Sequence, residues 1–426
     1  MKTILAALLS LSAFQCAQAQ WTIQNSPALP NSFIYQVEAV DANTAWAASP
    51  FMEVVKTTDS GLTWDSYPIT DPVFTSANVT AVSALDANTA WIIVGEMGQT
   101  YFSRIYRTTD GGQTWQHQPT AYSTPGSYGF HLHFFDANNG VALGFALTPG
   151  QGSRAEIITT SNGGLTWNAV SPANMPAIPP VDFMYNTLTT VGNTVWVMDI
   201  NLNILKSVDQ GRTWVSKTPG FTQPIGGAME GSLAFSDANN GLTGFNGELL
   251  RTTDGGSTWT NVNSTGTFFP FRIIPVPGTS LYLSSSRDIA NAGSSVSYDN
   301  GNTWVQLENS FRHFDMEFVD ANTGFSGGFN QMHRFRGALV GRPEEVSVAN
   351  NYTISPNPGT GIFTVSGPQL QNVTVEVYNV WGSKVFQKQS SLLQPLKIDI
   401  RNQAKGVYIV RIAGKGQVIN RKIILQ

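Results

Sequence analysis

Apolar and polar residues alternate in short runs along most of the chain. In runs such as 35–40 and 45–48 apolar residues recur at every second position, which is the period of a strand with one buried face. Glycine, asparagine, aspartate and serine separate the runs, and these residues are typical of tight turns. The pattern predicts an all-β chain of many short strands.

One octapeptide, Ser/Thr-x-Asp-x-Gly-x-Thr-Trp, returns six times between these runs. A side-chain oxygen at its third position can accept backbone N–H groups of a tight turn, and the glycine allows a positive φ. The tryptophan can pack beneath the turn. The residues at the third position are Asp59, Asp110, Asn162, Asp209, Asp254 and Asp299. The closing tryptophans are Trp64, Trp115, Trp167, Trp214, Trp259 and Trp304. We expect both sets to be structural, with one copy per repeat and therefore too far apart to form a site.

A second repeat is phased against the octapeptide. Asp-Ala-Asn turns begin at 41, 86, 136, 237 and 320, and degenerate copies near 192 and 278 complete a set of seven. Each turn lies between two alternating runs, a third run leads into the octapeptide, and a fourth strand begins at its tryptophan. Four strands in 40 to 55 residues correspond to one propeller blade. The repeats predict a seven-bladed β-propeller over residues 20–340.

The two ends of the propeller are expected to meet in one blade. Seven inner turns accompany only six octapeptides, and residues 21–26 resemble the strand at 259–264 that follows the fifth octapeptide. The last blade would take three strands from 311–337 and its fourth from 21–26. This pairing hides two strand edges that an open array would leave exposed.

On these repeats the chain from about 21 to 340 resembles Asp-box (BNR-repeat) propeller proteins, and its Asp-Ala-Asn turns resemble those of the photosystem assembly-factor-like group. Sialidases carry the same box together with an arginine triad, a Tyr–Glu nucleophile pair and an Arg-Ile-Pro motif ahead of the first box. The nearest echo of that motif, 271–275, has one residue too many and lies in the sixth blade. Asp-box xyloglucanases pair two propellers, and this chain has one. The resemblance implies the fold and leaves the activity open.

Candidate chemistry is expected at the central channel, where the innermost strands meet. The residues three and five before each Asp-Ala-Asn turn share one face of the innermost strand, because side chains alternate across a strand. The polar ones are Gln36, Glu38, Ser83, His131, His133, Ser232, Asp315 and Glu317.

Three of these residues are acidic and come from neighbouring blades. Glu38 and Glu317 could approach each other with Asp315 nearby, as a carboxylate pair for glycoside hydrolysis would. The alternative is that these groups are solvated or ion-paired, with Arg312 and His313 as partners. His131 and His133 at alternate positions could bind a metal, but without a visible carboxylate partner they are expected to line a wet channel. We expect neither a metal nor a cofactor. Gln36, His131, His133 and Arg312 are candidate ligand-binding residues.

The N-terminus has the features of a secretory signal peptide. Lys2 precedes an apolar run at 4–14, and Ala17-Gln18-Ala19 forms a cleavage motif before Gln20. The run is too short to span a bilayer, and no transmembrane segment is expected elsewhere. The single cysteine, Cys16, would leave with residues 1–19. We expect an exported protein without disulfides.

The repeats stop after about residue 341. Residues 341–350 are expected to be a linker, and 351–426 to be a small C-terminal β-sandwich of short alternating strands. Pro-Asn-Pro at 356–358, Val-Tyr-Asn at 377–379 and Lys-Gly-Val-Tyr-Ile-Val-Arg at 405–411 resemble the type A C-terminal sorting domain of the type IX secretion system of Bacteroidetes. The resemblance implies that the translocon and sortase of that system are partners. It also implies a protein that is secreted or held at the outer-membrane cell surface.

The charge of the chain argues against nucleic acid as a partner. Charged residues make up 12% of the chain and the net charge is −4, with no basic stripe. Two functions remain. The first is a non-enzymatic scaffold or binding module that recognises a glycan or a protein over the propeller face. The alternative is a secreted glycoside hydrolase or lyase that uses the channel carboxylates. The missing arginine triad and the missing second propeller favour the first.

Overall fold

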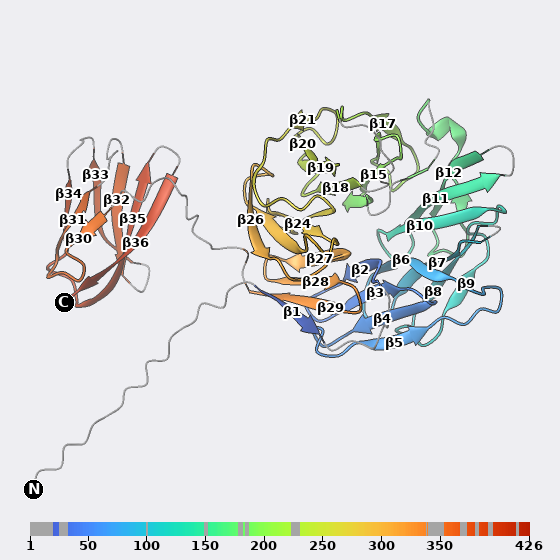
Figure 1. Ribbon diagram of the computed structural model, residues 1–426, viewed down its shortest axis with the longest axis horizontal. Helices are drawn as coiled ribbons and strands as arrows, with labels where there is room; N and C mark the ends of the chain where they lie inside the picture. Colours follow the sequence, from blue (N-terminus) through green and yellow to red (C-terminus); the bar gives the residue numbers. More distant parts are fainter. Residues whose placement is uncertain are drawn as a thin grey trace, which may run out of the picture. The chain divides into compact units, whose positions relative to one another are not determined.

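The computed structural model describes most of the chain in two compact units, Met1–Leu339 and Val340–Gln426 (Figure 1). The described residues are 20–24, 33–98, 101–148, 152–177, 182–183, 187–222, 231–337, 339, 353–366, 373–379, 383–390, 395–414 and 417–426. The expected signal peptide and linker lie outside them. In the described part of the chain, no helix has both the length and the apolar character that crossing a membrane requires.

The first unit is a β-propeller whose described residues form seven sheets, numbered here along the chain. Sheet 1 contains β2 (Gln36–Ala39), β3 (Ala45–Ser49), β4 (Glu53–Thr57) and β5 (Asp65–Pro68). Sheet 2 contains β6 (Asn78–Ala84), β7 (Ala90–Glu96), β8 (Phe102–Thr108) and β9 (Gln116–Gln118). Sheet 3 contains β10 (Ser127–Phe134), β11 (Gly140–Thr148), β12 (Gly152–Thr160) and β13 (Asn168–Ala169). A 3-10 turn, η1 (Pro172–Asn174), follows sheet 3.

The remaining sheets repeat this antiparallel order. Sheet 4 contains β14 (Thr189–Val191), β15 (Thr194–Met198), β16 (Ile204–Ser207) and β17 (Val215–Lys217). Sheet 5 contains β18 (Gly231–Phe235), β19 (Gly241–Phe245), β20 (Glu248–Thr252) and β21 (Thr260–Asn261). Sheet 6 contains β23 (Arg272–Pro275), β24 (Tyr282–Ser286), β25 (Gly293–Ser297) and β26 (Thr303–Glu308), with β22 (Thr265–Gly266) parallel to β26. Sheet 7 contains β27 (Asp315–Asp320), β28 (Thr323–Gly327), β29 (Met332–Arg336) and β1 (Gln20–Gln24).

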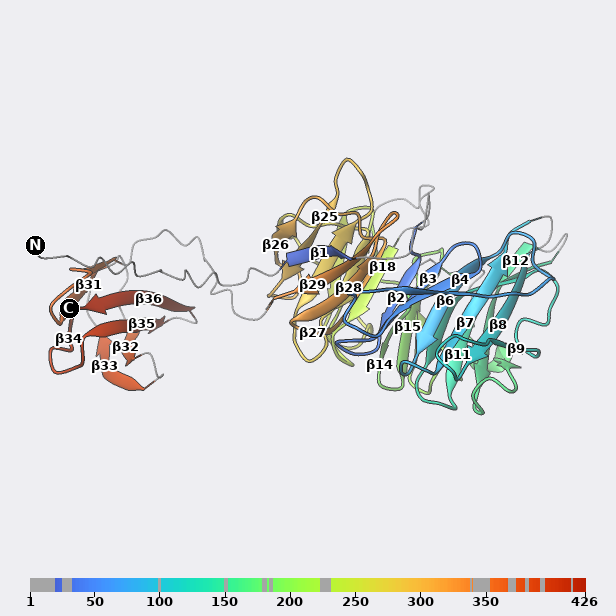
Figure 2. The same cartoon turned by 90° about the horizontal axis from the view of Figure 1, so that it is seen from below.

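The strand β1 joins the beginning of the propeller to its end. It pairs antiparallel with β29, from Gln20 opposite Arg336 to Gln24 opposite Met332 (Figure 2). Trp21 is buried in this sheet, and its indole nitrogen donates a hydrogen bond to Ser294 Oγ in sheet 6 at 3.0 Å. Residues more than 270 positions apart in the chain therefore share one core.

The first strands of successive sheets pack against one another around a common axis. The strand β27 contacts β2, β2 contacts β6, and β6 contacts β10. Likewise β14 contacts β18, β18 contacts β23, and β23 contacts β27. Apolar residues fill the space between neighbouring sheets, and the tryptophans Trp46, Trp91 and Trp196 are fully buried there. Each lies one or two residues after the turn between the first and second strands of its sheet, which we call the inner turn. The sequence repeat therefore places one large side chain at the equivalent position of each of these three sheets.

The octapeptides form the turns between the third and fourth strands. In the second copy, Asp110 accepts hydrogen bonds from the N–H of Thr114 at 2.9 Å and from its hydroxyl at 2.6 Å. This turn contacts the inner turn of the same sheet, because Gly111 of the octapeptide donates to the carbonyl of Asn88 in the inner turn at 3.0 Å. Both kinds of turn therefore lie at the same end of the sheets, and the innermost strands begin at the opposite end.

The second unit is a β-sandwich. One sheet contains β30 (Thr353–Ser355), β31 (Ile362–Ser366) and β34 (Leu396–Asp399). The other contains β33 (Lys384–Ser390), β32 (Val373–Asn379), β35 (Gly406–Gly414) and β36 (Gln417–Leu425). Phe363 and Ile398 of the first sheet pack against Val377 and Val410 of the second, all fully buried.

Candidate functional site

The innermost strands of the propeller are tied together by side chains at the channel. Asp315 Oδ2 accepts a hydrogen bond from the N–H of Val37 at 2.9 Å, and Glu317 Oε2 accepts one from Ala39 at 2.6 Å. Gln36 Oε1 accepts from Val82 in the next sheet at 3.0 Å. An innermost strand has a sheet neighbour on one side only, so alternate N–H groups would otherwise be buried without a partner.

The same connection recurs with serine. Ser83 Oγ accepts from the N–H of Phe134 at 3.0 Å, and Ser232 Oγ accepts from Ile273 at 2.5 Å. Five of the channel-facing residues that the repeat identified are therefore acceptors for N–H groups of the following sheet. Carboxylate, amide and hydroxyl oxygens all serve this purpose.

The structure brings together the three acidic residues that the sequence places at the channel. Asp315 is buried, while Glu38 and Glu317 are partly buried. Burial, followed by the charge of Glu317, raises the pKa of Glu38 well above its ordinary range. Burial also raises the pKa of Glu317 to about 8 and raises the pKa of Asp315. The carboxyl groups thus resist ionisation because the channel holds several of them in a poorly solvated place.

The prediction that Arg312 and His313 are the partners of these carboxylates is wrong. Arg272 in sheet 6 pairs with Asp315, with 2.8 Å between Nε and Oδ1. His313 instead contacts Ser326 and Glu308, at 2.5 Å and 3.1 Å. Arg312 instead donates to the carbonyl of Arg287 at 2.7 Å.

Arg272 was missed because the inner turn of sheet 6 is degenerate. Val276 donates to the carbonyl of Leu281 in the same way that Val40 donates to Thr44, so these two residues are equivalent. Counting four residues back from each gives Arg272 and Gln36. An alignment of the sheets on this hydrogen bond, rather than on Asp-Ala-Asn, would have identified the arginine.

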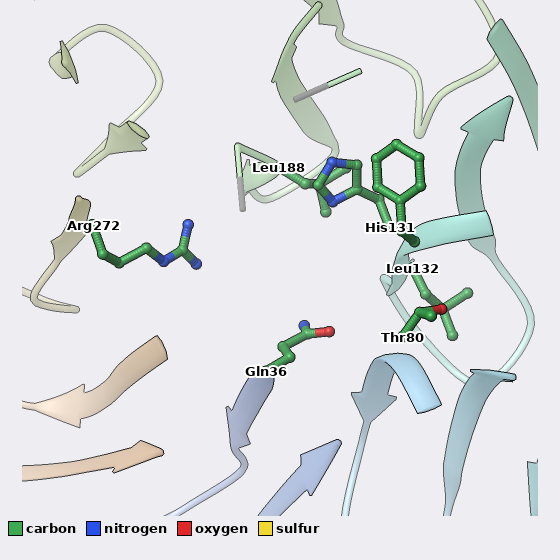
Figure 3. A pocket seen from close by; sticks show the side chains of 7 residues that line it. Gln36, Thr80, His131, Leu132, Leu188 and Arg272 are labelled. Atoms are coloured by element: carbon green, nitrogen blue, oxygen red, sulfur yellow. The ribbon is translucent and has the colours of Figure 1, made fainter. Parts of the chain in front are cut away.

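A small cavity of about 40 Å³ lies between the channel-facing side chains (Figure 3). Gln36, His131 and Arg272 lie around this space and come from three different sheets. Thr80, Phe130, Leu132 and Leu188 complete the lining. A cavity of this size holds a few water molecules at most.

The two histidines lie on the channel side of β10. His131 is buried beside Phe130, with 4.9 Å between ring centroids. Burial lowers the pKa of His133 to about 4, which favours the neutral imidazole. Among the described residues, no three histidine, cysteine, aspartate or glutamate side chains are grouped as metal ligands would be.

A much larger cavity, of about 1010 Å³, opens above the channel at the end where the innermost strands begin. We call it the mouth. Part of its wall comes from one repeat position, directly before the channel-facing residues, in six of the sheets. These wall residues are Tyr35, Thr80, Phe130, Gly231, Phe271 and Phe314. Four of the six are aromatic, and that regularity is the signal that sequence reasoning overlooked.

Two arginines lie at the rim of the mouth. Arg287, in the turn after β24, lies over the ring of Phe271 at 4.7 Å, and Arg312 lies over Phe314 at 5.2 Å. Arg312 Nε also donates to the carbonyl of Arg287 at 2.7 Å. Burial and the neighbouring charge of Arg312 lower the pKa of Arg287. The sequence had singled out only Arg312 of this pair.

Two parts of the chain match known protein families. Residues 353–426 match the secretion system C-terminal sorting domain, and residues 38–143 match the DUF6242 beta propeller domain. The chain is a β-propeller protein with a type IX sorting tail. The tail indicates a protein that is secreted or located at the cell surface.

Several solved structures are similar to this chain in fold. YCF48 from Cyanidioschyzon merolae has a TM-score of 0.56 at 16% identity, over 74% of this chain and 98% of that chain. YCF48 bound to D1 peptide has a TM-score of 0.54 at 16% identity, over 74% and 96%. An ancestral GH74 enzyme has a TM-score of 0.53 at 13% identity, over 95% of this chain and 63% of that chain.

One curated relative matches a short part of the chain. An endo-acting ulvan lyase of Formosa agariphila is 29% identical over 87 residues. The match covers 20% of this chain and 16% of the lyase. It leaves most of the lyase without a counterpart here.

Proposed function

We propose that the propeller is a non-enzymatic module that binds a glycan or a protein at the mouth, outside the cell that secretes it. The observation that carries this proposal is the contrast between two cavities that share Thr80 and Phe130 in their linings. The mouth is wide, aromatic and bordered by Arg287 and Arg312. The cavity among the channel-facing side chains holds about 40 Å³, and the carboxylates of the channel accept backbone N–H groups.

The size and lining of the mouth suit a ligand of oligomeric length. Binding sites for small molecules are typically ~300–1,000 Å³ and combine apolar or aromatic walls with a few polar groups. The mouth, at about 1010 Å³, reaches the upper end of that range. Its polar groups include Asn78 and Asn291 beside the aromatic wall.

The alternative function is a glycoside hydrolase or lyase that uses Glu38 and Glu317. Their raised pKa values would suit a general acid. However, a glycosidase needs space for a sugar ring between its carboxyl groups. Glu317 instead accepts a hydrogen bond from the N–H of Ala39, and the cavity beside Gln36 is too small for a sugar ring. These contacts favour binding without turnover.

The fold alone supports neither ligand class over the other. The YCF48 structure is of a protein that binds a peptide, and the GH74 structure is of an enzyme. We further propose that residues 20–340 form a closed seven-bladed ring, that 1–19 is a signal peptide and that 341–350 is a linker. The type IX translocon and sortase would then recognise 351–426.

A paired screen tests the proposed function. The full-length protein is applied to glycan and peptide arrays, and the same polymers are screened for hydrolysis and for elimination. Binding without turnover is expected, and it should survive Glu38→Gln and Glu317→Gln. Turnover that is lost in both variants would establish the enzyme and overturn the proposal.

A further inference from the structure

The rim of the mouth holds two arginines that are hydrogen-bonded to each other. Arg287 and Arg312 are linked through the 2.7 Å hydrogen bond from Arg312 Nε to the Arg287 carbonyl. Each lies over an aromatic ring, which restricts where its guanidinium can move. Asp288, next to Arg287 in the same turn, also lines the mouth, so an anion is expected to bind through the N–H donors of the guanidinium groups and not through the net charge of the rim. Guanidinium groups also bind carboxylate and sulfate-like oxygens through paired N–H donors.

An aromatic strip leads from this arginine pair into the mouth. Arg312 lies over Phe314, Phe314 lies 5.0 Å from Phe33, and Phe33 lies 6.3 Å from Tyr35 between centroids. Phe33 is 36% exposed and Tyr35 is 37% exposed, so both rings present surface to a ligand. The C–H bonds on one face of a sugar ring carry partial positive charge, and they are attracted to the negative face of an aromatic ring.

A peptide finds fewer partners in the same place. Extended peptides commonly bind by pairing with the free edge of a strand. At the channel, N–H groups of Val37, Val82 and Ile273 on three innermost strands already donate to side chains of the preceding sheet. The ladder positions that a peptide would need on these strands are therefore occupied.

We propose that the mouth binds an anionic oligosaccharide, with sugar rings on Phe33 and Tyr35 and a carboxylate or sulfate group between Arg287 and Arg312. This inference rests on the proposed binding function and specifies its ligand. Uronates and sulfated sugars present the same chemistry to the arginine pair, so the experiment separates them.

Isothermal titration calorimetry of the full-length protein tests the inference. The probes are an oligogalacturonate, a sulfated carrageenan oligosaccharide, a neutral cello-oligosaccharide of similar length and an oligoglutamate peptide. One or both anionic sugars should bind at least ~10-fold more tightly than the neutral sugar, a difference of about 1.4 kcal/mol. Their affinity should fall as salt rises, because the arginines are partly exposed.

Variants at the rim and on the strip identify the site. Arg312→Gln and Arg287→Gln should each weaken binding of the anionic sugar by ~10-fold or more, as loss of a charged hydrogen bond does. Arg312→Lys should recover part of that loss. Tyr35→Ala should weaken both charged and neutral sugars. Arg212→Gln, which makes the same charge change at an exposed position among the octapeptide turns, should have no effect.

Other outcomes separate this inference from the proposed function. A neutral sugar that binds equally well, and is lost in Tyr35→Ala but kept in Arg312→Gln, overturns the anionic ligand and keeps the binding module. Oligoglutamate binding with the same arginine dependence, without any sugar binding, shows a peptide ligand instead. Failure of every probe on the arrays and in the calorimeter, with correctly folded protein, overturns both.

Discussion

The carboxylate of Glu317 lies 2.6 Å from the backbone nitrogen of Ala39, and this hydrogen bond joins the last sheet of the propeller to the first. Asp315 makes the equivalent bond to Val37 at 2.9 Å. The two sheets come from opposite ends of the propeller sequence. Two of the acidic residues that suggested catalysis therefore connect the last sheet of the propeller sequence to the first.

The raised pKa of Glu317 makes this closure dependent on pH. Burial raises the pKa from 4.5 to about 8, so between these values the folded protein retains a proton that the unfolded chain has released. Stability therefore falls as the pH rises from about 4.5 to about 8. Glu317→Gln keeps an oxygen for the Ala39 N–H and cannot ionise. We expect its melting temperature to exceed that of the wild type at pH 8 by ~2–4 °C for each kcal/mol gained.

The control for this prediction is a glutamate away from the channel. Glu53→Gln in β4 should not reproduce the gain in melting temperature at pH 8. Melting temperatures of both variants are measured between pH 5 and pH 8.5. If the melting temperatures of Glu317→Gln and the wild type change with pH in parallel, the raised pKa of Glu317 is contradicted.

The pair of Arg272 and Asp315 is expected to be strongly coupled. Asp315 is 2% exposed, so Arg272→Gln leaves a buried carboxylate without its cation and should cost ~3–5 kcal/mol. Because ionisation of Asp315 then becomes less favourable, the loss should be larger at pH 8 than at pH 5. Asp315→Asn in the same chain removes the charge and keeps an acceptor for Val37.

Urea denaturation followed by tryptophan fluorescence measures this coupling. The double variant Arg272→Gln/Asp315→Asn should be more stable than Arg272→Gln alone. Simple addition of the two single effects would show that the contact contributes nothing to stability.

The N-terminal strand is expected to stabilise the whole propeller. Trp21 is buried, donates to Ser294 and packs 5.3 Å from Phe335 between ring centroids. Trp21→Ala should cost ~3–5 kcal/mol because it leaves a cavity and removes the hydrogen bond that Ser294 accepts. Deleting residues 20–24 should lower the melting temperature further and expose the edge of β29 to aggregation.

Ile23 is the matched control, since it lies on the same strand and is 56% exposed. Ile23→Ala should change stability by less than ~0.5 kcal/mol. Differential scanning calorimetry of the three proteins tests the closure. Unchanged melting after deletion of the strand would show that the ring does not depend on it.

The octapeptide aspartates are expected to affect stability and leave binding unchanged. Hydrogen bonds from Thr114 and Thr108 lower the pKa of Asp110 to about 2, so its contribution is present above the ordinary value of 3.8 and is lost as the pH falls toward 2. Asp110→Ala should lower the melting temperature at pH 7. Asp110→Asn should retain most of the wild-type stability, because Asn162 in sheet 3 accepts the equivalent hydrogen bond from the N–H of Thr166 at 3.0 Å.

Calorimetry of the Asp110 variants against the ligand of the mouth completes this test. Asp110 lies at the end of the sheets opposite the mouth, so the affinity should stay at the wild-type value. A loss of affinity in a folded Asp110→Ala protein would assign the octapeptides a direct role in binding.

Much of the fold could be predicted because the repeat carries it locally. Alternation defined the strands, and the Asp-Ala-Asn turns placed Gln36, Glu38, Asp315 and Glu317 on one face of their strands. Arg272 escaped because its turn lacks the Asp-Ala-Asn sequence and is longer by one residue. The pairing of Arg272 with Asp315 was missed for the same reason, and Arg312 was assigned to it wrongly.

The sequence by itself determined the strand periodicity, the two kinds of turn and the sorting tail, because each depends on residues close together in the chain. Only the tertiary structure decided that the channel carboxylates accept N–H groups of the next sheet, and that Phe33, Phe314 and Arg312 meet at one mouth. Those contacts depend on how successive sheets are arranged around the axis. The sequence repeat contains no information about which side chain of one sheet contacts the next sheet.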